Sequence, residues 1–334
     1  MKKHQYNQYY SKISIIRRHI KTSLPYLNIS KFLNILLSKI GEAIGLEIIR
    51  PKPFFIKIEP TNKCNLRCPG CRQALGEKDH MPGGYFGDMD FSAFAKIIDE
   101  LKKYLVKVSL YFEGESLING QISQMVKYLS DRNIGSVIST NFNYLPDKLA
   151  EELVANRLTH LIVCLDGYNE ETYQRYRRGG SFQKVVENIK KIQIEKNKQK
   201  SKYPLVEIQT INFSYYSSEE KEKIKLLAEK LGADYFTFKD DLNSYYNNPR
   251  PAGKRCFWLY GHPAFRWDGE VQPCCYYYNK EDNNFGNIKE SSVRQIWNNK
   301  KYRAARRYFK NGEKDKSLNI RCYYCDFFKY ENNK

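Results

Sequence analysis

The chain has 334 residues, 41% of them hydrophobic, which is enough for one large domain with its own core and a smaller one. Its net charge of +19 leaves open a solvated basic surface, an anionic substrate or membrane surface, and nucleic acid. No apolar run reaches about 18 residues, which excludes a membrane-spanning helix. Seven of the nine cysteines fall in short-spaced groups, and without secretory targeting they predict metal ligation in a reducing cytoplasm and argue against a disulfide-stapled protein.

Residues 1–50 are predicted to form a basic helical extension. Eight lysines or arginines precede the first acid, Glu42. Apolar residues at helical spacing predict an amphipathic helix. They are Phe32, Leu33, Leu36, Leu37, Ile40, Ile44 and Ile48. We expect this apolar face to dock on the following domain, with binding to a partner or to a membrane surface as alternatives. Pro51 and Pro53 predict the end of the helix.

From residue 53 onward, strand and helix patterns alternate. The predicted strands are 54–59, 107–112, 136–140, 159–166, 206–211 and 235–238. The predicted helices are 91–105, 122–130, 146–155, 182–197 and 218–231. This alternation predicts an α/β domain over residues 51–245 with a parallel sheet, open or curved. In parallel barrels, the chemistry gathers at the C-terminal ends of the strands.

A cysteine triplet follows the first predicted strand directly. Cys64, Cys68 and Cys71 are spaced as C-x3-C-x2-C. Three thiolates on one loop can hold three irons of a [4Fe–4S] cluster and leave the fourth open to a small molecule. The alternative is a zinc site completed by His80. The spacing resembles the signature of the radical S-adenosylmethionine (radical SAM) enzymes, in which the open iron chelates SAM, although Gly70 stands where many members have an aromatic residue.

The end of the second predicted strand resembles a further element of that family. Gly114 and Glu115 match the GGEP turn, with Glu113 and Ser116 in place of its first glycine and its proline. In the family this turn meets the amino group of SAM. The resemblance therefore implies that Gly114 and Glu115 bind SAM.

The third and fourth predicted strands end in two more such elements. Ser139 and Asn141 lie in a segment that resembles the TNG element contacting the SAM carboxylate or ribose, with Phe142 in place of the glycine. Asp166 is the aspartate of a segment that resembles the family's S-x-D-G pattern, and Arg177 resembles the arginine that follows this pattern in the family. A strand-end Asn or Asp is by itself more often a turn former or helix cap. Their order after the cysteine triplet favours the radical SAM interpretation over zinc.

Cys164 stands where the S-x-D-G pattern has its serine. One hypothesis is a thiol that donates a hydrogen atom to a substrate radical. The alternative is a small buried residue at a strand end, because a free cysteine packs as an apolar group.

The region from 246 to 334 has a different character, following a predicted linker at 243–254. Cys256, Gly269 and Cys274 fit the spacing C-x(9–15)-G-x4-C and thereby resemble the SPASM domain. Cys322 and Cys325 close the region as C-x2-C. Four cysteines can ligate one auxiliary [4Fe–4S] cluster completely. One alternative is a zinc site made of the same four cysteines. If the site binds a cluster, Cys275 is an alternative ligand to Cys274. No cysteine follows Cys325, so the second cluster of the full SPASM pattern is not expected. Asp268 and Gly269 predict a hairpin turn.

The resemblance implies a partial (β/α)6 TIM-like barrel with an N-terminal helical extension and a small SPASM-like or twitch-like domain. It implies a radical SAM oxidoreductase or maturase that cleaves SAM to a 5′-deoxyadenosyl radical and abstracts hydrogen from an unactivated C–H bond. The substrate would be a peptide or a sugar-like or phosphorylated small molecule, oxidised through the auxiliary cluster, with epimerisation or crosslinking of a peptide as alternatives. A flavodoxin- or ferredoxin-type protein would donate electrons. The competing hypothesis, a basic metal-stapled nucleic-acid-binding protein, does not explain why the SAM-type motifs end successive strands.

Overall fold

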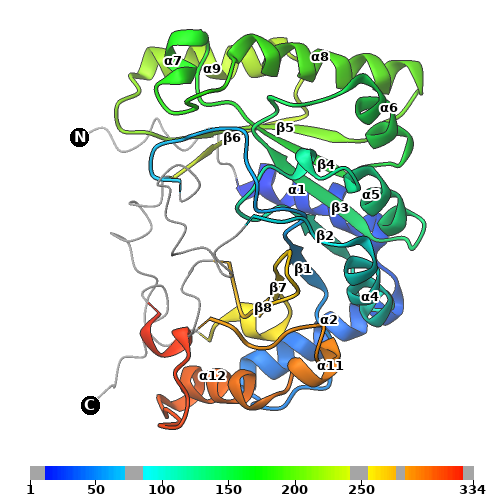
Figure 1. The fold of residues 1–334 in the computed structure, drawn as a ribbon, viewed down its shortest axis with the longest axis vertical. Coiled ribbons are helices and arrows are strands. Elements are labelled where there is room, and N and C mark those ends of the chain that lie inside the picture. The colour runs from blue at the N-terminus through cyan, green and yellow to red at the C-terminus, as the bar shows by residue number, and fades with distance from the viewer. Residues whose placement is uncertain (1–11, 72–85, 241–254, 276–282, 326–334) are drawn as a thin grey trace. The chain divides into compact units, whose positions relative to one another are not determined.

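The computed structural model describes residues 12–71, 86–240, 255–275 and 283–325 (Figure 1). The chain divides into two compact units, each built from segments that are separate in sequence. Unit 1 comprises Met1–Tyr26, Lys63–Gly76 and Glu113–Asp241, and unit 2 comprises Leu27–Asn62, Glu77–Phe112 and Leu242–Lys334. The predicted linker and His80 lie outside the described residues, and the predicted domain boundaries stay a prediction.

Unit 1 contains four parallel strands in the order β3-β4-β5-β6. They are β3 (Gly135–Thr140), β4 (His160–Cys164), β5 (Leu205–Ile211) and β6 (Tyr235–Lys239). Its helices after residue 113 are η5 (Ser116–Ile118), α5 (Ile122–Ser130), α6 (Asp147–Ala155), α7 (Glu170–Gln174), α8 (Phe182–Lys198) and α9 (Ser218–Lys230). The four strands and the four longer helices that the sequence predicts for this region are confirmed. A helix between each pair of strands lets neighbouring strands run parallel.

The N-terminal segment adds α1 (Lys12–Ser23) and η2 (Leu24–Tyr26) to unit 1. Arg18 donates a hydrogen bond to Glu207 at 2.5 Å, and His160 Nε2 lies 2.9 Å from the same carboxylate. The Tyr26 hydroxyl lies 2.7 Å from that of Thr159. These polar contacts attach α1 and η2 to the beginnings of β4 and β5, and the sequence pattern did not predict them.

Unit 2 contains four strands in the order β2-β1-β7-β8. They are β1 (Phe55–Ile58), β2 (Lys107–Leu110), β7 (Ala264–Phe265) and β8 (Val271–Gln272). Its helices are α2 (Ile29–Ile44), α4 (Phe91–Leu101), η6 (Phe257–Tyr260), α11 (Val293–Ile296), α12 (Lys300–Asn311) and η7 (Arg321–Tyr324). β1 is parallel to β2 and β7, whereas β7 and β8 form an antiparallel hairpin. Gly269 has φ of 91° within it, which confirms the predicted turn.

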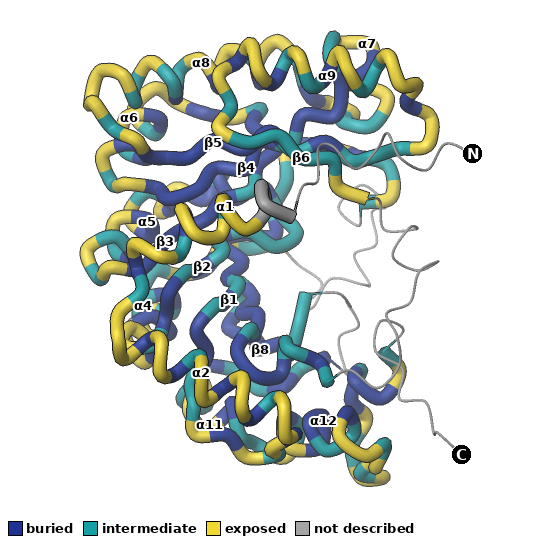
Figure 2. Tube along the Cα trace, turned by 180° about the vertical axis from the view of Figure 1, so that it is seen from behind, coloured by how far each residue is buried: buried dark blue, intermediate teal, exposed yellow. Residues whose placement is uncertain are grey.

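Helix α2 confirms the predicted amphipathic helix but corrects its orientation. Asn28 caps its first turn through a hydrogen bond to the Lys31 amide, and Gly45 ends it with φ of 69°. The buried side of α2 is made of Lys31, Asn34, Ser38 and Gly41. The predicted apolar face is exposed along its whole length (Figure 2). Docking of that face on the described part of unit 2 is therefore wrong, because small and polar residues occupy the inward side.

The predicted α/β class and its parallel strands are confirmed. In the part of the chain that the structure describes, no helix has the length and apolar character needed to cross a membrane.

Candidate functional site

The cysteine triplet lies on a loop of unit 1. Cys68 is buried, and Cys64 and Cys71 are half-buried. The Cys71 amide donates to the Cys68 carbonyl at 3.1 Å, and Gly70 between them has φ of 74°. A positive φ favours glycine over an aromatic residue, which explains why this chain departs from the family pattern at Gly70. The loop is held by two backbone hydrogen bonds, from Glu115 to Lys63 and from Arg67 to Arg178.

Two hydrogen-bond donors lie against the sulfurs of this loop. Asn141 Nδ2 is 3.7 Å from Cys64 Sγ, and Arg177 Nη1 is 3.9 Å from Cys68 Sγ. Arg177 Nε also donates to Asp166 at 2.6 Å, and the other Asp166 oxygen accepts the Ile211 amide at 2.6 Å. The ends of β3 and β4 therefore bring Asn141 and Asp166 to the thiol loop, and Asp166 orients Arg177.

Glu115 is buried and has its carboxylate fully engaged by this chain. It accepts hydrogen bonds from the Leu117 amide at 3.1 Å, the Thr140 hydroxyl at 2.7 Å and the Asn141 amide at 2.7 Å. Burial raises the pKa of Glu115, and these three donors oppose the rise. The carboxylate thus fixes the backbone at Asn141. Gly114, directly before it, is half-buried.

The remaining predicted site residues of unit 1 lie at the ends of β3 and β4. The Ser139 hydroxyl is 3.5 Å from Cys164 Sγ, and both residues are half-buried. All seven predicted SAM-site or catalytic residues and the cysteine triplet therefore belong to unit 1. The roles assigned to the individual residues stay predictions.

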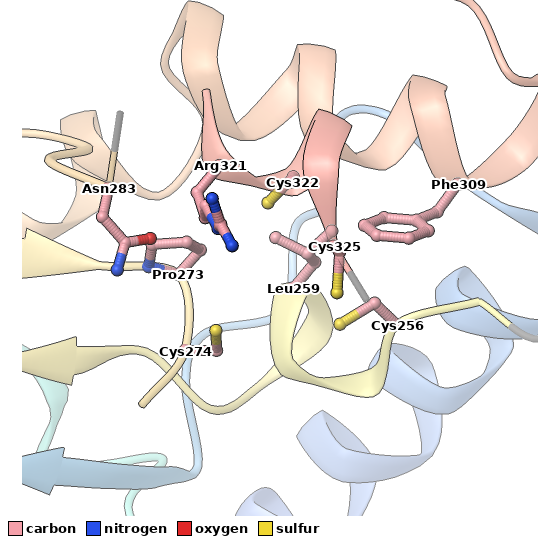
Figure 3. A pocket seen from close by; sticks show the side chains of 9 residues that line it. All are labelled: Cys256, Leu259, Pro273, Cys274, Asn283, Phe309, Arg321, Cys322 and Cys325. Atoms are coloured by element: carbon pink, nitrogen blue, oxygen red, sulfur yellow. The ribbon is translucent and has the colours of Figure 1, made fainter. Parts of the chain in front are cut away.

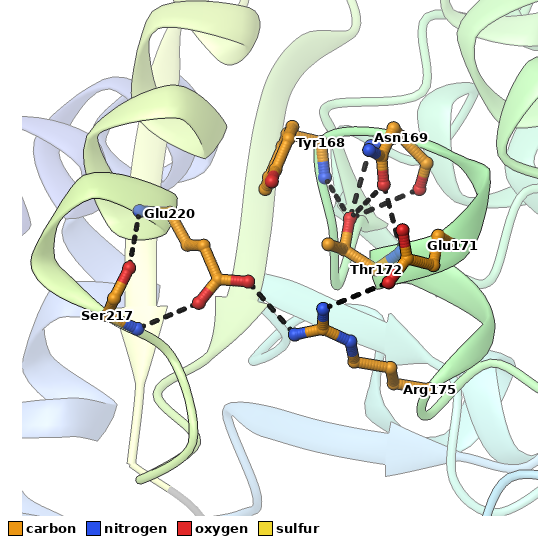
Figure 4. A network of polar contacts seen from close by, with 7 residues as sticks. All are labelled: Tyr168, Asn169, Glu171, Thr172, Arg175, Ser217 and Glu220. Carbon is orange, nitrogen blue, oxygen red and sulfur yellow. Dashed lines mark hydrogen bonds and ion pairs between the residues drawn. The ribbon is translucent and has the colours of Figure 1, made fainter.

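Helices α7 and α9, which follow β4 and β5, both begin with a capping box (Figure 4). Asn169 and Thr172 form a capping box at α7, and Ser217 and Glu220 form another at α9. Arg175 at the end of α7 donates to Glu220 at 2.9 Å and joins the two starts. Since Arg177 lies two residues beyond Arg175, this network fixes the backbone that carries it.

The thiols of the triplet suit metal ligation. Burial raises the pKa of Cys64 to about 11 and also raises the pKa of Cys68, an effect that the Arg177 charge opposes. Buried thiols are normally protonated at neutral pH, but a bound metal deprotonates them. The arrangement of three thiols on one loop, with one cation and one amide donor beside them, fits a [4Fe–4S] cluster held by three thiolates.

A second thiol site lies in unit 2, where Cys256, Cys274, Cys322 and Cys325 line one cavity (Figure 3). Cys256 precedes η6, Cys274 follows β8, and the last two belong to η7 and its end. The cavity encloses about 310 Å³ of empty space, including its open mouth. Its other walls are Leu259, Pro273, Asn283, Phe309 and Arg321. Cys275, the alternative ligand, is not among the lining residues.

The second site suits a cluster better than a single metal ion. Four thiols that line one cavity from three separate segments can surround a cube of iron and sulfur. Among the described residues, no three His, Cys, Asp or Glu side chains gather closely enough to hold one ion. Burial raises the pKa of Cys256 to about 12 and raises that of Cys322, and the neighbouring thiols contribute to both shifts. The thiols lie close enough for a charge on one to raise the pKa of another.

Arg306 is a buried cation within the basic helix α12. It is fully buried and donates to the carbonyls of Leu259, Glu47 and Trp297 and to the Asn298 side chain, at 2.9 to 3.0 Å. Leu259 lines the thiol cavity, so Arg306 ties α12 to its wall. Counting charges along the sequence could not separate it from its exposed neighbours, because a basic helix has both an inner and an outer face.

Two protein families match the chain. Residues 58–212 match the radical SAM superfamily, and residues 256–326 match the SPASM family, an iron–sulfur cluster-binding domain. The first match contains the triplet and the residues around Glu115, Asn141 and Asp166. The second begins at Cys256 and contains all four thiols of the second site.

Individual proteins support the same assignment. The chain is 24% identical, over 307 residues, to the tungsten-containing aldehyde ferredoxin oxidoreductase cofactor-modifying protein of Pyrococcus furiosus, with 74% of this chain and 82% of that protein covered. It is 26% identical, over 204 residues, to the probable GTP 3′,8-cyclase of Methanocaldococcus jannaschii, covering 59% of this chain and 63% of the relative. The crystal structure of Streptococcus suis SuiB bound to precursor peptide SuiA shares the fold, with a TM-score of 0.59, 13% identity and coverage of 76% and 66%.

The two family matches, and the two thiol sites that they contain, agree on one assignment. Residues 58–212 form a radical SAM domain and residues 256–326 a SPASM domain, and the cofactors of these domains are SAM, a SAM-binding [4Fe–4S] cluster and an auxiliary [4Fe–4S] cluster.

Proposed function

We propose that this chain cleaves SAM reductively and uses the resulting 5′-deoxyadenosyl radical to abstract hydrogen from an unactivated C–H bond of a peptide or small molecule, with net oxidation. One observation carries the proposal: Asn141 and Arg177 lie against two sulfurs of a loop that has three cysteines. When bound by those three thiolates, the cluster supplies an open iron that chelates the SAM amino and carboxylate groups and an electron that cleaves it.

The surrounding residues would bind and orient SAM. Arg177 supplies a positive charge beside Cys68, and its ion pair with Asp166 holds it there. Asn141 offers its amide beside Cys64, with its backbone fixed by Glu115. Gly114 and Ser139 are the further proposed SAM contacts. Preorganised donors of this kind reduce the ordering cost of binding.

The closed set of thiols in unit 2 supports the oxidative outcome. When all four thiolates ligate one cluster, no iron is open to substrate, so the site suits electron transfer. Net oxidation removes a hydrogen atom, then one electron and one proton, from the substrate. The electron would pass to the auxiliary cluster, and a flavodoxin- or ferredoxin-type protein would supply the electron that cleaves SAM.

A second candidate is a maturase that epimerises or crosslinks a peptide. The fold is shared with SuiB, whose structure holds a precursor peptide. Epimerisation would need a hydrogen-atom donor to the substrate radical, and Cys164 is the proposed donor. Its half-buried thiol beside Ser139 at 3.5 Å is consistent with that role and equally with simple packing.

The direct test uses the protein reconstituted anaerobically with iron and sulfide. With SAM and dithionite we expect 5′-deoxyadenosine and methionine in equal amounts, even without the natural substrate. The Cys275→Ala variant is the matched control and should form both at the wild-type rate, because Cys275 lies at neither thiol site. A reconstituted protein that forms no 5′-deoxyadenosine would contradict the proposed function.

A further inference from the structure

The outward face of α2 is an apolar surface on a helix whose inward face is polar. The exposed fractions are 52% for Phe32, 55% for Leu37 and 56% for Ile44. Leu33, Leu36 and Ile40 belong to the same face, Leu46 and Ile48 follow the end of the helix, and all five are exposed by more than two-fifths. We call these eight residues the α2 surface. Soluble monomers rarely expose continuous apolar patches beyond a few hundred Å², and larger ones mark binding sites.

The rotation of α2 is fixed by its buried side. Asn34 exchanges two hydrogen bonds of 2.9 Å with the backbone of Lys52, and the Ser38 hydroxyl donates to the Tyr260 carbonyl. Gly41 on the same side packs near Ile49, where a Cβ would lie at an ordinary contact distance of 3.5 Å. Turning the apolar face inward would break these hydrogen bonds and bury larger side chains in their place. The exposure of the α2 surface is therefore built into unit 2.

Cations from separate segments of unit 2 lie near α2. Arg255 donates to the Ala43 carbonyl, and Lys310 Cγ lies 3.1 Å from where a side chain would begin at Gly45. Beside the middle of the helix, the Lys52 backbone is held by Asn34, and α11, which carries Arg294, is joined to the same segment by a 3.1 Å hydrogen bond from Trp297 Nε1 to the Pro51 carbonyl. Basic residues that are distant in the sequence thus gather near one apolar helix.

The acids near α2 do not cancel this charge. Glu42 pairs with Lys39 at 2.7 Å, and Glu47 pairs with Arg307 at 2.8 Å. Each of these two acids has its own cation, so among the residues that the structure describes Arg255, Arg294 and Lys310 add positive charge near the helix. An apolar stripe with cations near it is the arrangement of helices that lie in the interface of a membrane.

We propose that the α2 surface binds an anionic lipid bilayer, with α2 in the plane of the interface and the nearby cations on the headgroups. Apolar side chains enter the acyl boundary, and basic side chains near the surface are attracted to anionic lipid. A second copy of the chain is a poorer occupant, because pairing two α2 surfaces would bring the same cations together in a chain of net charge +19.

Vesicle flotation with the full reconstituted chain tests the proposal. The probes are vesicles of phosphatidylcholine alone and vesicles of phosphatidylcholine mixed equally with phosphatidylglycerol. We expect binding to the mixed vesicles that weakens as salt is added, and weak binding to the neutral ones. Absence of binding to the mixed vesicles would overturn the proposal.

Matched variants locate the binding surface. Replacing Leu37 and Ile44 by glutamine should weaken binding by roughly tenfold for each side chain. The control replaces Ile194 and Leu226, which are 52% and 53% exposed on α8 and α9, and should bind as the wild type does. The pair Arg294→Gln and Lys310→Gln should reduce binding to mixed vesicles only. Equal loss in the control pair would overturn the assignment to α2.

Sedimentation velocity without lipid tests whether the α2 surface binds a second copy of the chain instead of a bilayer. We expect the wild type and the Leu37→Gln, Ile44→Gln pair to have the same oligomeric state. A wild-type dimer that becomes a monomer in this pair would overturn the proposal in favour of a second copy. SAM cleavage with dithionite should be unchanged in every α2 variant, which shows that each is folded and separates this inference from the proposed function.

Discussion

The two thiol sites have similar polar neighbours and differ in their number of thiols. Beside Cys64 and Cys68 lie the Asn141 amide and the Arg177 guanidinium. The quartet of unit 2 also shares its cavity with an asparagine and an arginine, Asn283 and Arg321, besides apolar residues. Three thiolates leave one iron of a cluster open to a polar ligand such as SAM, whereas four thiolates leave none. The number of thiols therefore decides whether a cluster can bind a ligand of its own.

The largest expected effect is on the three-thiol site. Changing Cys64, Cys68 and Cys71 together to alanine should abolish 5′-deoxyadenosine formation under dithionite, because no thiolate then holds the SAM-binding cluster. Product can be quantified by liquid chromatography after anaerobic reconstitution. The Cys275→Ala variant serves as control, and undiminished product from the triple variant would contradict the role of this loop.

The quartet should lose metal without losing SAM cleavage. In the Cys322→Ala, Cys325→Ala variant, iron should fall from about eight to about four per chain, since each cluster contributes four. Uncoupled SAM cleavage should persist while substrate turnover falls. Metal analysis also separates the zinc alternative, in which the wild type would contain zinc and both proteins about four irons. Equal iron in the two proteins would rule out the auxiliary cluster at this site.

Acid should weaken unit 2 through His262. This side chain lies among the rings of Phe54, Phe55 and Phe257, and burial lowers its pKa from 6.5 to about 4. The folded form therefore holds neutral histidine, so its stability is complete above pH 6.5 and falls as the pH drops towards 4. At pH 5 the loss should be about 2 kcal/mol in the free energy of unfolding.

Urea unfolding followed by tryptophan fluorescence measures this loss, because all three tryptophans lie in unit 2. The His262→Gln variant should lose the corresponding part of the difference between pH 7 and pH 5. The same pH dependence in wild type and variant would assign the acid sensitivity to other groups.

The smallest expected effect is on SAM affinity. Asn141→Ala should raise the Kd for SAM by roughly tenfold, the worth of one or two hydrogen bonds, with little change in thermal unfolding. Isothermal titration under anaerobic conditions measures it, with Asn156→Ala at the end of α6 as the control. Wild-type affinity in the Asn141 variant would show that this amide does not contact SAM.

Much of the α/β scaffold could be predicted from periodicity. The six parallel strands occur where the sequence predicts them. Strands β3, β4 and β5 read as nearly continuous apolar segments because almost all their residues are buried, whereas β1 and β2 alternate buried and half-buried residues. Helices α1 and η2 were missed, since their contacts, from Arg18 to Glu207 and from Tyr26 to Thr159, are long-range polar interactions. Such contacts leave no periodic signal in the residues that make them.

The sequence alone determined the two sets of cysteines and the order of the strand-end motifs, because ligand spacing and turn chemistry are local. Only the tertiary structure decided which side chains reach them. It buried Arg306 in what reads as a basic surface helix, engaged Glu115 with Asn141, and turned the apolar face of α2 outward. An amphipathic pattern shows that a helix has two faces, but which face is buried depends on the surface against which it packs.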